Sequence, residues 1–384
     1  MAETPLNVVR DFHTLLKMMV RREASDLFIT AGLAPSLKIN GEISPVSESP
    51  LNADQVRKLA YSLMNDHQRA EFAENLESNF AIAPPDTGRF RVNVFQQKNH
   101  VGIVLRRIKT DIPTFEELKI PEVLSELSMA KRGLVIVVGA TGTGKSSTLA
   151  AMLGYRNRNS RGHIITVEDP IEYVHEHSGC IITQREVGVD TVSFEAALRN
   201  TLRQAPDVIL IGEIRTRETM EHAIAFAETG HLCLTTLHAN NANQALDRIL
   251  NFFPKERREQ TLLDLSLNLR AIVGQQLIPT PDKKGRRVAI EILMNTPLVS
   301  QLIRDGQVTE LKDVMSRSNQ QGMITFDQAL FELYKTQQIS YQDALHHADS
   351  ANELRLMIKL DQKNCPKKMS DSLSGVTLVN IDES

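Results

Sequence analysis

A glycine-rich segment at residues 139–146 matches the spacing G-x-x-x-x-G-K-S. Such a loop turns backbone N–H groups toward phosphate oxygens, and the N-terminus of the helix after it favours negative charge. Its lysine is expected to contact the β- and γ-phosphates of a nucleotide, and its serine to hold Mg²⁺. A chance match is the alternative, and the strand-like and helix-like flanks argue against it. The residues expected to bind the nucleotide are Gly139, Ala140, Thr141, Gly142, Thr143, Gly144, Lys145, Ser146 and Ser147.

Two further segments place carboxylates directly after an apolar strand. Residues 208–211 are followed by Gly212-Glu213, and residues 163–167 lead into a stretch that ends at Glu172. A nucleotide-binding sheet needs an acid at a strand end to orient Mg²⁺ and water. Glu213 is therefore a candidate for the metal site, and Glu172 for a general base over the γ-phosphate. The alternative for both is a solvated strand end.

The elements that must position these residues follow from the hydrophobic pattern. Four segments are continuous apolar strands with helical segments between them, as a parallel sheet covered on both faces requires. They are residues 134–138, 163–167, 208–211 and 233–237. The pattern predicts an α/β domain with a mostly parallel sheet, followed by helices beyond Pro297.

The residues before this domain have a different pattern. We expect a helix over 6–20, a second helix over 52–74, and paired strands over 89–95 and 101–108. Together these elements predict a small α+β domain. The expected divisions are an N-terminal domain at 1–110, a linker at 111–120, an ATPase-type domain with C-terminal helices at 121–364, and a flexible tail at 365–384.

Composition limits the function. Hydrophobic residues make up 41% and charged residues 24% of the chain, which is typical of globular proteins. The net charge of −3 and the absence of tryptophan disfavour a nucleic-acid partner. Three cysteines without a C-x-x-C pair support neither a zinc site nor a disulfide framework, and reduced thiols suit the cytoplasm. No signal peptide and no apolar stretch of about 20 residues is found, so we expect a soluble chain.

Taken in order, the motifs resemble those of the secretion-superfamily ATPases, and most of all the type IV pilus retraction ATPases, the PilT/PilU family. The phosphate loop looks like a Walker A motif, residues 168–172 like the Asp box, Gly212-Glu213 like Walker B, and residues 228–238 like the His box. Two segments of the N-terminal domain, at 24–27 and 88–93, also match. The resemblance covers roughly residues 6–360.

The resemblance implies a PAS-like N-terminal domain, a RecA-like P-loop ATPase domain and a homo-hexamer that hydrolyses ATP with Mg²⁺. It implies that Glu172 is the catalytic glutamate, that Glu213 acts on Mg²⁺ through water, and that His238 senses the γ-phosphate. His231 would anchor the same motif; taken alone it reads better as a buried, satisfied histidine. N-terminal-domain arginines would close over the nucleotide, and the alternative is a solvated basic strand. The candidates are Arg89, Arg91 and Arg106.

Two departures favour the PilU branch. Ser300 replaces the first arginine of a C-terminal motif of the retraction motors, and Phe28 replaces a histidine. With the extended tail, they point to an accessory motor, bound to an inner-membrane platform protein and to the principal, PilT-like retraction ATPase. Such a motor would be cytoplasmic and peripherally attached to the inner membrane. The alternatives are a scaffold that binds ATP without hydrolysing it, and a pilus-assembly or type II secretion ATPase.

Overall fold

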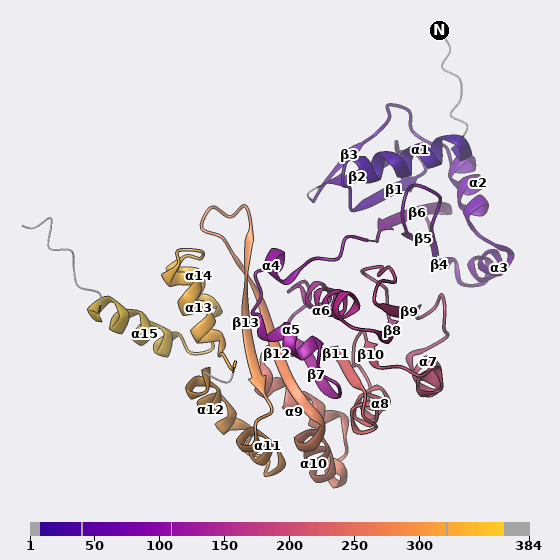
Figure 1. The fold of residues 1–384 in the computed structure, drawn as a ribbon. Coiled ribbons are helices and arrows are strands. Elements are labelled where there is room, and N and C mark those ends of the chain that lie inside the picture. Colours follow the sequence, from indigo (N-terminus) through magenta and orange to yellow (C-terminus); the bar gives the residue numbers. More distant parts are fainter. Residues whose placement is uncertain (1–7, 40, 109, 320–321, 365–384) are drawn as a thin grey trace, which may run out of the picture.

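The computed structural model describes residues 8–39, 41–108, 110–319 and 322–364. They form two sheets, each with its own hydrophobic core, and a group of C-terminal helices (Figure 1). The expected flexible tail, 365–384, lies outside the described residues. Within the described ranges, no helix is long and apolar enough to cross a bilayer.

The smaller sheet is antiparallel, with the strand order β3-β2-β1-β6-β5-β4. Its helices cover one face, where Leu16, Leu27, Val56 and Phe90 pack with other buried apolar side chains. This unit is the α+β part that the sequence predicts. Its elements are α1 (Val8–Arg21), β1 (Asp26–Thr30), β2 (Ser36–Ile39), β3 (Glu42–Pro45), α2 (Ala53–Leu63), α3 (Asp66–Asn75), β4 (Glu77–Ile82), β5 (Phe90–Gln97) and β6 (His100–Arg107).

The single helix expected over 52–74 is wrong, because the chain forms two helices there. Met64 and Asn65 adopt extended backbone angles between α2 and α3. The Asn65 side chain accepts a hydrogen bond from Gln68 N at 2.9 Å, and the Gln68 side chain bonds back to Asn65 N. This capping box starts a new, mostly polar helix, of which only Phe72 is buried.

The larger sheet has the order β13-β12-β7-β11-β10-β8-β9 and is parallel except for the β12–β13 pair. The predicted mostly parallel sheet is confirmed. One hydrophobic cluster on one face includes residues of α8, α9 and α11, and another on the opposite face includes α5 and α6. The elements up to the end of the sheet are α4 (Phe115–Leu118), α5 (Val123–Ser128), β7 (Gly133–Val138), α6 (Lys145–Asn159), β8 (Gly162–Glu168), β9 (Cys180–Glu186), α7 (Phe194–Thr201), η1 (Leu202–Gln204), β10 (Val208–Ile211), α8 (Arg217–Glu228), β11 (Leu232–Leu237), α9 (Ala242–Phe252), η2 (Lys255–Arg257), α10 (Arg258–Asn268), β12 (Leu269–Pro279) and β13 (Arg286–Met294).

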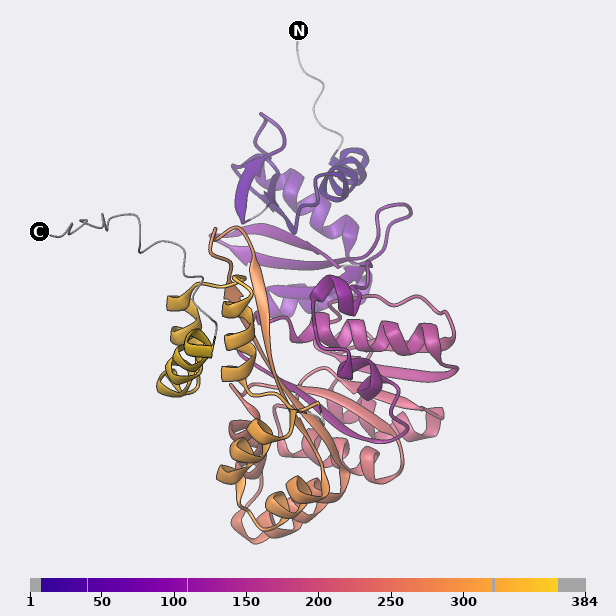
Figure 2. The ribbon, with the colours of Figure 1, turned by 60° about the vertical axis from the view of Figure 1, so that its left-hand side comes forward.

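Helices follow the sheet, as expected beyond Pro297. Phe326 and Leu330 of α13 pack with Ile278 and Ala289, so α13 lies against the β12–β13 hairpin (Figure 2), while α11 packs with the cluster that includes α8 and α9. They are α11 (Pro297–Arg304), η3 (Val308–Glu310), α12 (Leu311–Arg317), α13 (Phe326–Lys335), α14 (Tyr341–His347) and α15 (Ala351–Asn364).

The segment expected as a linker, 111–120, contains helix α4. Phe115 and Ile120 are buried in the same cluster as Leu153 of α6. The second half of the segment therefore packs with the larger sheet. The exact domain boundaries stay predictions.

Candidate nucleotide site

The phosphate loop joins β7 to α6 at the edge of the sheet where the parallel strands end. Gly139 has a φ of 155°, and a Cβ there would lie 2.5 Å from the carbonyl oxygen of Gln275. Gly144, with a φ of 92°, is the N-cap of α6. Glycine is needed at both positions, because a side chain would meet either forbidden backbone angles or its neighbour. The loop thus has the shape that the motif predicts.

The Lys145 side chain lies over this loop. Its Nζ donates hydrogen bonds to the carbonyl oxygens of Gly139, at 2.8 Å, and Ala140, at 2.9 Å. Burial lowers the pKa of Lys145, and the negative charge of Glu213 opposes that shift. An ammonium group held in this way over a loop of backbone N–H groups suits a phosphate oxygen, which would replace the two carbonyls.

Gln275 of β12 holds the loop in place, and no motif or pattern predicted a role for this residue. Its Nε2 donates to the carbonyl oxygen of Thr143 at 2.9 Å, and its Oε1 accepts from Thr148 Oγ1 at 2.8 Å. Gln275 is almost fully buried. The available signal was a pair of glutamines, 275 and 276, inside an otherwise apolar run.

Glu213 and His238 form a pair beside Lys145. Glu213 lies two residues after β10 and His238 directly after β11, at the same edge of the sheet. His238 Nε2 is 2.9 Å from Glu213 Oε1, and Arg215 Nη2 is 2.8 Å from Glu213 Oε2. The carboxylate is therefore oriented from both sides.

The residues expected to hold Mg²⁺ fit that ion. Ser146 is exposed in the first turn of α6, and the Glu213 carboxylate is near enough to Lys145 to act on its pKa. Mg²⁺ prefers oxygen ligands and binds through one or two carboxylates together with substrate phosphates and water. Among the described residues, no group of three or more His, Cys, Asp or Glu side chains forms a protein-only metal site.

Glu172 lies in the loop that follows β8, and one hydrogen bond ties this loop to the phosphate loop helix. The Tyr173 hydroxyl is 2.7 Å from Ser147 Oγ. Glu172 itself is exposed, while Ile171 before it is buried. Its nearest neighbours in sequence are thus fixed, and the Glu172 carboxylate is free to face a ligand.

A second carboxylate in this region, that of Glu168, has a pKa that is shifted by burial. Burial raises the pKa of Glu168, at the end of β8, to about 7, although hydrogen bonds from Thr166 and Gln184 act in the opposite direction. Thr166 Oγ1 lies 2.6 Å from Glu168 Oε1. Burial therefore favours the neutral, protonated form of Glu168 at pH values where an ordinary glutamate is ionised.

Two of the candidate arginines are cross-strand neighbours. Arg91 of β5 pairs in register with Arg106 of β6. Arg91 Nη2 donates to the carbonyl oxygen of Ile171 at 3.4 Å, so this arginine reaches the loop of the larger domain. Arg106 Nε lies 2.7 Å from the buried Asp26. This hydrogen bond raises the pKa of Arg106, and the charge of Glu172 acts in the same direction.

Arg89 lies just before β5. Its Nε is buried and has no hydrogen-bond partner among the described residues. Burying a guanidinium N–H without a hydrogen-bond acceptor lowers the stability of the fold. This side chain is therefore suited to bind an anionic acceptor that does not belong to the chain.

His231 is not brought to this group within one chain. It lies before β11, whereas His238 follows the same six-residue strand, which separates them by roughly 20 Å. His231 Nδ1 instead lies 3.1 Å from Thr229 Oγ1 and 3.3 Å from the carbonyl oxygen of Phe226. These contacts hold the His231 side chain in the turn that follows α8.

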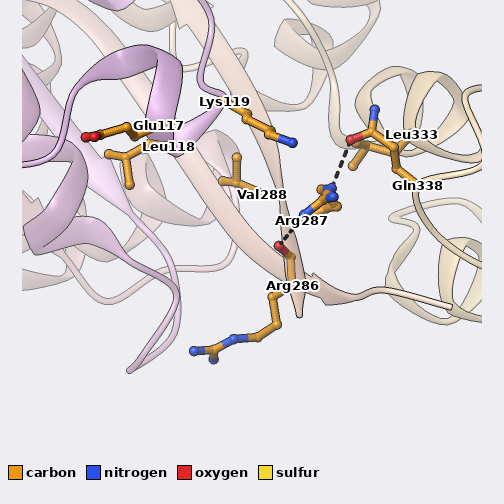
Figure 3. A pocket seen from close by; sticks show the side chains of 8 residues that line it. All are labelled: Glu117, Leu118, Lys119, Arg286, Arg287, Val288, Leu333 and Gln338. Carbon is orange, nitrogen blue, oxygen red and sulfur yellow. Dashed lines mark hydrogen bonds between the residues drawn. The ribbon is translucent and has the colours of Figure 1, made fainter. Parts of the chain in front are cut away.

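A pocket elsewhere on the larger domain contains none of the predicted site residues. It lies between the end of α4, the start of β13 and the end of α13 (Figure 3). Its lining residues are Glu117, Leu118, Lys119, Arg286, Arg287, Val288, Leu333 and Gln338.

Similarity to known proteins identifies the family of this chain. Residues 3–359 match the family model described as "Type II/IV secretion system protein". The chain is 63% identical to the type IV pilus ATPase PilU of Pseudomonas aeruginosa, over 97% of this chain and 98% of that protein. The chain belongs to the type II/IV secretion system protein family.

Within this family, the similarity differs between branches. Identity to the type IV pilus retraction ATPase PilT of Pseudomonas aeruginosa is 42%, over 88% of this chain and 98% of that protein. A crystal structure of the pilus retraction motor PilT with bound ADP superimposes with a TM-score of 0.84 at 40% identity, covering 89% of this chain and 98% of that chain. The predicted fold class and the resemblance to the PilU branch of secretion ATPases are confirmed.

Proposed function

We propose that the protein is an ATP-hydrolysing motor of the type IV pilus machine and works as a ring of six copies. The observation that carries the ATPase part is the hydrogen bond between Tyr173 and Ser147. It fixes the loop that bears Glu172 beside the phosphate loop, which holds Lys145. The similarity to PilU and PilT supports the assignment to the pilus machine.

In the proposed reaction, the loop at 139–146 binds the phosphates of ATP, and Lys145 exchanges its two carbonyl acceptors for phosphate oxygens. Mg²⁺, held by Ser146 and through water by Glu213, would neutralise phosphate charge. Glu172 accepts a proton from the attacking water as its oxygen bonds to the γ-phosphorus and the bond to the β-phosphate oxygen breaks. His238 donates a hydrogen bond to the γ-phosphate and loses that contact after hydrolysis.

The arginines of the N-terminal domain supply the remaining positive charge. Arg89, whose Nε has no hydrogen-bond partner among the described residues, stabilises the charge that develops on the phosphoryl oxygens, as arginine fingers do. Arg91 contributes mainly through its field, because its guanidinium already contacts the Ile171 carbonyl and Glu186. Arg106 contributes mainly through its field, because Asp26 already occupies its guanidinium. Movement of this domain would then couple hydrolysis to rotation of the ring.

We place this motor on the cytoplasmic side of the inner membrane, attached to the platform protein, as an accessory to a PilT-like principal retraction ATPase. Ser300 supports the accessory role. Its hydroxyl donates to the carbonyl oxygen of Ser266 at 2.7 Å, a packing contact between α11 and α10 where the retraction motors carry an arginine.

Pilus retraction in cells tests this proposal. In cells that keep the principal motor, replacing this chain by Glu172→Gln is expected to lower retraction force or twitching as much as deleting it. Undiminished function with Glu172→Gln would favour a scaffold that does not hydrolyse ATP. Normal retraction with this chain as the sole motor would contradict the accessory role.

A further inference from the structure

The backbone of Ile171, directly before Glu172, is held from two domains. Its N–H donates to Glu186 Oε2 at 3.2 Å, and its C=O accepts from Arg91 Nη2 at 3.4 Å. Glu186 ends β9 in the larger domain, whereas Arg91 belongs to β5 of the smaller one. These bonds hold the two successive peptide groups that flank the Ile171 Cα, so the backbone before Glu172 has little freedom.

The Glu186 carboxylate is itself fixed. Only 3% of the residue is exposed, which restricts the movement of the carboxylate. Its backbone N–H separately donates to Asp190 Oδ2 at 2.9 Å in the turn after β9. In the β8–β9 ladder it pairs with Glu168. A buried carboxylate requires a positive partner, and Arg91 Nε, 3.9 Å from Glu186 Oε1, supplies it.

The position of Arg91 depends on how the small domain sits. Arg91 reaches the Ile171 carbonyl, and the charge of Glu172 helps to raise the pKa of Arg106, the cross-strand neighbour of Arg91. This face of the small domain therefore lies over the Glu172 loop. If the small domain moves away, Glu186 loses its cation and the Ile171 carbonyl loses its donor. The opposite side of Glu172 remains held, because Tyr173 bonds to Ser147 within the large domain.

We propose that Glu186 is a positioning residue for ATP hydrolysis, which with Arg91 fixes the backbone at Ile171 and so aims Glu172 only when the small domain is docked. This inference rests on the proposed function, in which Glu172 is the general base. Glu186 touches no part of the nucleotide in this scheme. It acts on the turnover step, because misplacing a catalytic group by about 1 Å can cost 100-fold in rate.

Steady-state kinetics and ATP affinity of the full chain test the proposal. Glu186→Gln and Arg91→Gln are each expected to lower kcat about 10- to 100-fold. ATP affinity should change less than about threefold, because the phosphate loop lies on β7, four strands from β9 in the sheet. The double variant should be no slower than the slower single variant, since both remove the same contact.

Three further variants serve as controls. Arg91→Lys keeps the charge and should recover part of the kcat lost in Arg91→Gln. Asp190→Asn disturbs the turn after β9 without touching Ile171 and should leave kcat within about twofold. Hydrogen exchange at the Ile171 amide should accelerate in Glu186→Gln, even if that variant is less stable, while amides of β7 keep their protection.

The outcomes separate this inference from the proposed function. Normal turnover by Glu172→Gln would overturn both. A loss of turnover in Glu172→Gln, with unchanged kcat in Glu186→Gln and Arg91→Gln, would overturn only the positioning role. Equal losses in Asp190→Asn and Glu186→Gln, or additive losses in the double variant, would also contradict it.

Discussion

At the scale of single residues, the site depends on polar groups that hold the backbone of its loops. Lys145 and Ser146 were visible in the motif, but the partners that keep the motif in shape were not. Gln275 reaches the phosphate loop from a strand 132 positions away in the sequence. Such a contact depends on the order of strands in the sheet, which no local pattern specifies.

Replacing Gln275 by alanine is expected to weaken ATP binding about tenfold and to destabilise the fold by about 1–3 kcal/mol. The reason is that the Thr143 carbonyl and the Thr148 hydroxyl would lose their buried partner. ATP titration and urea denaturation measure both effects. Gln276→Ala is the matched control, because Gln276 contacts His347 instead. Equal effects of the two changes would contradict this role of Gln275.

Glu168 predicts a pH dependence of stability. Burial raises its pKa to about 7, above the ordinary value of 4.5, so the folded chain binds more protons between these values than the unfolded chain. Its contribution is therefore present at low pH and lost as the pH rises through about 7.

The variant Glu168→Gln should thus gain stability relative to the parent chain as the pH rises from 5 to 8. Thermal denaturation of both proteins across this range measures the difference. Taking the difference between the two proteins cancels the pH dependence that other groups contribute to stability. One such group is His175, because burial lowers its pKa to about 4. A difference in melting temperature that stays constant with pH would contradict this account.

At the scale of elements, the hydrophobic pattern predicted the strands that carry the site. Strands β7, β8, β10 and β11 are continuous apolar runs, and periodicity alone finds them. Strand β12 was missed because Gly274, Gln275 and Gln276 interrupt its apolar residues. The interruption is functional, since Gln275 serves the phosphate loop.

The break between α2 and α3 was missed for a different reason. Beyond Met64 the apolar pattern is too sparse to mark a boundary, since only Phe72 of α3 is buried, and the capping box of Asn65 with Gln68 starts the new helix. Asn65→Ala should lower the free energy of unfolding of the small domain by about 1 kcal/mol. Urea denaturation measures this loss. Asn75→Ala, at the exposed end of α3, should have little effect, and an equal effect would argue against the cap.

At the scale of the whole molecule, two hydrophobic cores are joined by few polar contacts, of which Arg91 to Ile171 and Glu186 are central. Sequence could not predict this contact, because it depends on how two separately folded units dock. The position of His231 likewise depends on the fold: it shares a motif with His238 in the sequence, but β11 places the two residues at opposite ends of the strand.

This arrangement predicts that nucleotide binding in the large domain also changes the hydrogen-exchange protection of the small domain. A non-hydrolysable ATP analogue should slow hydrogen exchange in β5 and β6 of the small domain, although the phosphate loop lies in the large one. In Arg91→Gln the slowing should be confined to the large domain. Equal protection of β5 and β6 in both proteins would show that Arg91 does not couple the domains.

The central claim is that Glu172 activates water against a nucleotide held by the phosphate loop. Its most direct test is the ATP turnover of purified Glu172→Gln, with ATP affinity measured on the same sample. General-base catalysis contributes about 100- to 10,000-fold, so we predict a loss of turnover of that size with affinity nearly unchanged. Turnover equal to that of the parent chain would contradict the account.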